Sequence, residues 1–88
     1  MMTKTEVLEK IVVLMREMED LCVKLAKAKT VGDVRFIAAA TLIVSGEARK
    51  LIGSAMHLSG DKDITESVSC LVIGLEAMGK LMAKSISI

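Results

Sequence analysis

The stretch from Asp33 to Gly46, which reads DVRFIAAATLIVSG, is the feature that most constrains the fold. Between Phe36 and Val44 only Thr41 carries a polar side-chain group, so a helix over this stretch has no polar face to present to water. In a chain of 88 residues, the two remaining segments are too few to surround such a helix. We therefore expect the protein to associate with copies of itself.

The overall composition supports the same expectation. Hydrophobic residues make up 52% of the chain, and a lone domain of this size buries only about 60–65% of its unfolded surface. A membrane-spanning helix needs about 20 mainly apolar residues, but Arg35 precedes the apolar run and Glu47, Arg49 and Lys50 follow it. The net charge of +1 provides no overall field for DNA or a membrane surface. We expect a homo-oligomer without a DNA or membrane partner.

The pattern of apolar residues predicts an all-α domain over residues 1–88, with helices at about 4–29, 33–59 and 64–84. A capping box of Thr3 and Glu6 begins the first helix. Thr30 and Asp33 can cap the second, and Gly32 is expected to break the chain between the two. Because this link is short, the first two helices should form an antiparallel hairpin. Gly60 is the expected stop of the second helix, and Asp63 with Glu66 the expected cap of the third.

Each outer helix carries a row of apolar residues at alternating spacings of four and three, as in packed helices. A second apolar row beside the first widens the apolar face of the first helix. The first row is Val7, Ile11, Leu14, Met18, Leu21, Leu25 and Ala28; the second is Leu8, Val12, Met15, Cys22 and Ala26; the third helix has Ile64, Val68, Leu71, Leu75, Met78 and Met82.

The two cysteines, Cys22 and Cys70, lie in apolar helical pattern and not in a metal-spaced cluster. Buried, reduced thiols are the favoured interpretation, and a disulfide is the alternative. The first ten residues contain lysines and carboxylates where a signal peptide needs an apolar core. We expect a cytoplasmic protein.

The sequence is poor in catalytic residues. It has one histidine, His57, no tyrosine or tryptophan, and no glycine-rich phosphate loop. A surface histidine needs no special role, and the seven methionines occupy positions typical of core packing. We expect no enzymatic activity, no cofactor and no metal site.

Two groups of residues are candidates for binding. Lys24, Lys27 and Lys29 end the first helix and Arg35 begins the second, which concentrates positive charge beside a helix N-terminus, where phosphate binds readily. The alternative is that these lysines only complement the negative end of the first helix. Thr41, Ser45 and Arg49 form a polar strip with spacings of four on an otherwise apolar helix. They could line a pocket between subunits, or the hydroxyls could bond to their own helix.

The order REMEDL in the first helix, a short polar turn, and then DVRFIAAATL followed by Ser45-Gly46 resembles the helical-hairpin phage proteins that counter cyclic-oligonucleotide signalling, the second type of anti-CBASS sponge. The similarity covers about Leu14 to Leu51. The resemblance implies a homo-oligomer, hexameric in the family, that sequesters cyclic dinucleotides or trinucleotides between protomers and so blocks a host antiviral effector.

The resemblance also implies roles for particular residues. Arg35 and Phe36 match the Arg-aromatic pair of the family, Arg16 falls where a basic residue is usual, and Thr41 with Ser45-Gly46 matches its Thr-Gly element after a shift of one residue. The chain has no tyrosine, so Phe36, His57 or an arginine plane would have to stack on a base. The ligand-binding candidates are Arg16, Lys24, Lys27, Arg35, Phe36, Thr41, Ser45 and Arg49.

Two other classes of function remain open at this stage. The first is a helical interaction module whose only chemistry is its interface, which the excess of apolar residues favours. The second is an enzyme of the chorismate-mutase type, in which Arg16, Arg35, Lys50 and Glu47 would grip a dianion, although no residue spacing specifically indicates it.

Overall fold

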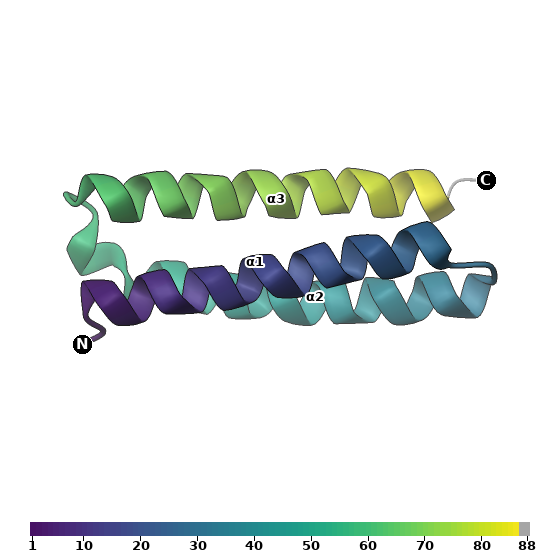
Figure 1. Cartoon of the computed structure of the whole chain (residues 1–88), viewed down its shortest axis with the longest axis horizontal. Helices are drawn as coiled ribbons and strands as arrows, with labels where there is room; N and C mark the ends of the chain where they lie inside the picture. The colour runs from purple at the N-terminus through teal and green to yellow at the C-terminus, as the bar shows by residue number, and fades with distance from the viewer. Residues whose placement is uncertain (87–88) are drawn as a thin grey trace.

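The computed structural model describes the backbone of residues 1–86 and the side chains of residues 1–85. The chain forms three long helices, α1 (Lys4–Lys27), α2 (Val31–Ser54) and α3 (Lys62–Ile86), with a short 3₁₀ turn, η1 (Met56–Leu58), before α3. The helices lie side by side and alternate in direction, so the bundle is elongated, with extents of 43 × 17 × 16 Å (Figure 1). Both α2 and α3 pack against α1. The prediction of an all-α fold with three packed helices is confirmed.

Local capping explains where the first two helices begin. The hydroxyl of Thr3 accepts from the amide of Glu6 at 3.2 Å, and the Glu6 carboxylate accepts from the amide of Thr3 at 3.3 Å. Thr30 and Asp33 form the same reciprocal pair. The expected break at Gly32 is wrong, because this capping box starts α2 at Val31 and places Gly32 inside its first turn.

The second connection differs from the prediction. The helix was expected to reach about residue 59, but α2 ends at Ser54, where the amide of Ala55 bonds to the carbonyls of both Leu51 and Ile52. Such shared bonds tighten the chain into the 3₁₀ turn that follows. The cap of α3 is also different, because the carboxylate of Asp61, and not that of Asp63, accepts from backbone amides of the first turn.

Nine of the fourteen buried core residues belong to the apolar rows predicted for α1 and α3, and the other five lie on α2 or at its C-terminal cap. The second row of α1 is less covered than expected: Leu8 and Cys22 are half-buried, but Val12 and Met15 are exposed, because α2 and α3 cover only part of the α1 surface. The buried core residues are Val7, Ile11, Leu14, Met18, Leu21, Ile37, Val44, Ala48, Leu51, Ala55, Ile64, Leu71, Met78 and Met82.

The apolar stretch of α2 is only half covered within one chain. Ile37 and Val44 are buried against α1 and α3, whereas Phe36, Leu42 and Ile43 are 69%, 74% and 64% exposed. The prediction that this helix lacks a polar outer face is therefore confirmed. A single copy of the chain leaves this apolar surface in water.

The two cysteines are free thiols, Cys22 half-buried and Cys70 exposed. The expectation of a buried thiol is wrong for Cys70, because this residue lies on the outer side of α3, away from the row that packs on α1. None of the helices described in residues 1–86 is long and apolar enough to cross a bilayer.

Candidate functional site

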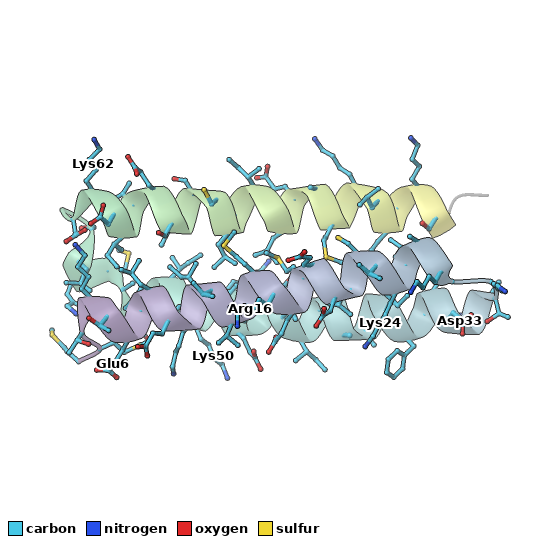
Figure 2. All side chains as sticks on the ribbon, in the orientation of Figure 1. Glu6, Arg16, Lys24, Asp33, Lys50 and Lys62 are labelled. Atoms are coloured by element: carbon cyan, nitrogen blue, oxygen red, sulfur yellow. The ribbon has the colours of Figure 1, made fainter. Side chains whose placement is uncertain are left out.

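Within one chain, the eight candidate ligand-binding residues do not form a single cluster. Figure 2 shows Lys24 nearer the α1–α2 connection and Arg16 nearer the middle of the bundle. Eight residues of helix separate these two side chains by about 12 Å along the axis. Arg35 and Arg49 are about 21 Å apart along α2 by the same measure. Within one chain, a compact ligand therefore cannot contact Arg35 and Arg49 together.

A hollow of about 710 Å³ lies beside the connection between α1 and α2. Among the eight candidates only Arg35 lines it, and Lys29 adds a second positive charge. The remaining walls are mostly apolar and come from all three helices: Leu25, Ala28, Thr30, Val31, Val34, Ala38 and Ser85.

Asp33 reduces the suitability of this connection for an anion. Its carboxylate accepts from the backbone amides of Lys29 at 3.1 Å and Thr30 at 3.2 Å. These bonds, and that with the Thr30 side chain, stabilise the charged carboxylate and lower the pKa of Asp33 below its ordinary value. The negative charge of this carboxylate at the start of α2 repels a phosphate.

The environment of Lys24 is acidic. Its groove, of about 360 Å³ between α1 and α2, is also lined by Glu17, Asp20 and Glu47. Three carboxylates beside one ammonium make the groove net negative, so it repels a phosphate. Lys27 is exposed in the last turn of α1, where its charge complements the negative end of the helix dipole. The interpretation of these lysines as helix-end charges therefore fits their surroundings.

The polar strip of α2 is divided between two environments. The hydroxyl of Thr41 donates to the carbonyl of Ile37 at 2.8 Å, which is a bond within the same helix. Ser45 is half-buried, while Arg49 is exposed on the outside of the bundle. Of this strip, Arg49 is the residue best placed to reach a ligand.

Arg35 and Phe36 are both exposed near the start of α2, and Arg16 is exposed on α1. Within residues 1–85, none of Arg16, Arg35 and Arg49 forms a recorded ion pair or side-chain hydrogen bond. The three guanidinium groups therefore keep their donors available to water or to an anion.

Charged side chains also meet in a hollow of about 540 Å³ between α1 and α2, where Lys10, Glu47 and Lys50 lie together. The labelled Lys50 points away from α3 in Figure 2. His57 lies elsewhere, at the end of the bundle, where its Nε2 donates to the carbonyl of Met2 at 2.8 Å. That contact gives His57 a structural role in holding the N-terminal residues.

Two features were not predicted from the sequence. Ser85 joins Arg35 and Lys29 at the first hollow, because the three helices alternate in direction and the end of α3 lies beside the start of α2. The second feature is a row of small exposed residues on α2 at a constant spacing of seven. They are Gly32, Ala39, Gly46 and Gly53.

Within the described part of the chain, no three His, Cys, Asp or Glu side chains gather as a metal site would require. Comparisons with models of protein families, with curated proteins and with solved structures found no match.

Proposed function

We propose that this protein is a self-associating, non-enzymatic helical protein that binds and sequesters cyclic dinucleotides or trinucleotides between its copies. The observation that carries the proposal is the exposure of Arg35, Phe36 and Arg49 on the same helix, with no recorded ion pair or side-chain hydrogen bond to the guanidinium groups in residues 1–85. The resemblance to the phage sponges leads us to expect Arg35 and Phe36 at the ligand, and Arg49 comes from the polar strip of α2. A hexamer, as in that family, is the corresponding assembly.

The chemistry of the candidate residues fits such a ligand. A cyclic dinucleotide carries two phosphates, and guanidinium groups form bidentate, charge-assisted bonds with phosphate oxygens. The exposed ring of Phe36 offers a flat apolar surface on which a base can stack. Binding and sequestration require no nucleophile or general base.

Two related copies supply what one copy lacks. Because Arg35 and Arg49 are about 21 Å apart along one helix, a compact ligand cannot bridge them within a chain. Residues of two symmetry-related chains can converge on one ligand and present the same group to both of its phosphates. Exclusion of water by the apolar helix faces would strengthen these charged contacts.

A helical interaction module that binds no small molecule is the second candidate. Two contacts favour it: the Thr41 hydroxyl is bonded to its own helix, and the Asp33 carboxylate, which accepts from the amides of Lys29 and Thr30, places a negative charge at the start of α2. In that case the exposed Leu42 and Ile43 serve only to bring protein surfaces together.

Thermal unfolding with a panel of cyclic dinucleotides and trinucleotides distinguishes the two candidates. A ligand present at 100 times its Kd stabilises the folded state by about 2.7 kcal/mol, which raises the apparent Tm. We expect at least one member of the panel to do so at tens of micromolar. If none does, the sequestration proposal is wrong and the interaction module is favoured.

Variants locate the binding site. Arg35→Ala and Arg49→Ala should each weaken the binding of the active ligand by at least tenfold, because a charge-assisted bond contributes about 1.5–3 kcal/mol. Lys62→Ala is a matched control, since Lys62 is an exposed cation at the start of α3 with only a 3.9 Å contact to Glu66. An equal loss in all three variants would indicate a general charge effect and no specific site.

A further inference from the structure

We propose that the outer face of α2 is an interface on which a second copy of the chain packs, antiparallel and related by a two-fold axis. We define this face by the row of small residues Gly32, Ala39, Gly46 and Gly53 together with its apolar neighbours Phe36, Leu42 and Ile43. All seven are exposed. The interface itself does not depend on the proposed ligand.

The small residues determine how closely another helix can approach. At 3.6 residues per turn, each step of seven residues drifts by only about 20°, so the four residues stay on one side of the helix, opposite the buried Ile37, Val44 and Ala48. A Cβ added at Gly46 or Gly53 would meet nothing within 4 Å in the isolated chain. No contact within the protomer therefore requires glycine at these two positions. Glycine in a helix interior lowers stability. A close contact with a helix of another copy explains why glycine is present at Gly46 and Gly53.

The three exposed apolar side chains supply a large part of the area that a stable dimer needs. An exposed aromatic side chain presents about 150–250 Å², so Phe36, Leu42 and Ile43, at 69%, 74% and 64% exposure, together present on the order of 400 Å². That is about half of the roughly 800 Å² that each partner buries in a standard interface. The isolated chain of 9.4 kDa exposes 6124 Å², whereas a monomeric protein of this mass exposes about 5,000 Å².

The exposed face of α3 is less suitable for a second copy. On α3 the exposed Ile73 and Leu81 are separated by Glu76 and Lys80, so charges interrupt the apolar surface. On the outer face of α2, Arg35 is the charged residue between Gly32 and Gly46, and the exposed Lys50 follows between Gly46 and Gly53. The uninterrupted apolar part of this face therefore extends from Phe36 to Gly46.

The spacing of the small residues selects one antiparallel register. Gly32 then faces Gly53 of the second copy, and Ala39 faces Gly46 of the second copy. The two-fold axis passes between Leu42 and Ile43, so each of these side chains meets its own counterpart. This register pairs all four small residues, and it opposes the helix dipoles, which favours antiparallel over parallel packing.

The same register brings distant arginines together. Arg35 and Arg49 lie on the same side of the outer face, and the two-fold axis places Arg35 level with Arg49 of the second copy to within about one residue, or 1.5 Å. Each dimer therefore has two such pairs. This step rests on the proposed function, because a phosphate group is the partner that would relieve the repulsion between two guanidinium groups.

Substitution of Gly46 tests the interface. Gly46→Gln adds bulk in open space and replaces glycine by a better helix former, so the protomer should remain folded with an unchanged or higher Tm. By sedimentation equilibrium, it should weaken self-association by at least tenfold. Gly79→Gln is the matched control, because Gly79 is also exposed and open but lies on α3. A monomeric wild type at hundreds of micromolar, or equal association of the two variants, would overturn the proposal.

Disulfide trapping tests the orientation. In a Cys22→Ser, Cys70→Ser background, a mixture of Ala39→Cys and Gly46→Cys chains should form the mixed disulfide at least fivefold faster than either variant forms its own dimer. Faster formation of the Ala39→Cys homodimer would show parallel packing and contradict the antiparallel register. Both experiments are performed without nucleotide, so failure to bind cyclic nucleotides leaves their outcome unaffected.

Discussion

A Cβ added to Gly74 of α3 would lie 2.9 Å from the Cε of Met18 of α1, closer than ordinary side-chain contacts allow. Met18 and Gly74 therefore fit together where α1 and α3 pack, with the end of the methionine filling the space that a larger residue on α3 would occupy. Because a methionine has a flexible end, this contact can adjust to one added methyl group.

Substitutions at Gly74 and Gly79 should have different effects on stability. Gly79→Ala meets nothing within 4 Å and should raise the free energy of unfolding by about 0.5–1 kcal/mol. Gly74→Ala should gain less, because Met18 has to move, and Gly74→Leu should cost about 1–3 kcal/mol through overpacking. Urea unfolding measures all three. Equal stabilisation by alanine at both positions would show that Met18 does not restrict Gly74.

The contact of Lys4 with Asp61 predicts a dependence of stability on pH. The Lys4 Nζ lies 3.1 Å from Oδ2 of Asp61, and the Asp61 Oδ1 accepts from the amide of Ile64. The backbone bond from Ile64 and the ammonium of Lys4 lower the pKa of Asp61 below its ordinary value of 3.8. The stabilisation is therefore complete above the unfolded pKa and is lost as the pH falls through the lower folded pKa.

Asp61→Asn should reduce stability at pH 6, and its difference from wild type should shrink below about pH 4 as the wild-type carboxylate becomes protonated. Urea unfolding at pH 6, 4 and 3 measures this difference. Asp20→Asn serves as a control, because the exposed Asp20 accepts no recorded hydrogen bond within residues 1–85. A pH-independent difference between wild type and Asp61→Asn would contradict the prediction.

Local patterns in the sequence predict the parts of the fold that depend on neighbouring residues. The capping boxes of Thr3 with Glu6 and of Thr30 with Asp33 involve residues three apart, so they can be recognised without knowledge of the bundle. The end of α2 cannot be predicted in this way. The shared hydrogen bonds of the Ala55 amide and the turn that follows depend on how the chain crosses the end of the bundle to reach α3.

The candidate site shows the same limit. The sequence indicates that Lys24 is in the last turns of α1, but only the packing of α2 places Glu47 in the same groove. Likewise, the sequence identifies Thr41 as a polar exception in an apolar helix, but not whether its hydroxyl points outward or bonds to the helix. Contacts between residues far apart in sequence depend on how the helices pack together. The apolar pattern of a single helix does not define that packing.

Thr41→Val tests which candidate residues contact a ligand. Since the Thr41 hydroxyl donates to the carbonyl of Ile37, we expect this substitution to leave cyclic-nucleotide binding within twofold of wild type. It should change the free energy of unfolding by less than about 0.5 kcal/mol. Calorimetric titration and urea unfolding provide the two readouts. A tenfold loss of affinity at unchanged stability would show that Thr41 is part of the binding site.

Arg49 provides a test of the link between anion binding and self-association. If Arg35 and Arg49 of two copies face each other, a multivalent anion that binds both should strengthen the dimer by mass action. Inorganic pyrophosphate at millimolar concentration should then lower the dimer Kd severalfold at constant ionic strength. Without pyrophosphate, Arg49→Gln should associate at least as tightly as wild type, because one repelling charge is removed. Pyrophosphate should not lower the dimer Kd of this variant.

Lys62→Gln is the control. If pyrophosphate lowers the dimer Kd equally in Lys62→Gln and wild type but not in Arg49→Gln, the effect is assigned to the outer face of α2. A response that persists in Arg49→Gln would instead contradict the pairing of Arg49 with Arg35 across the two-fold axis.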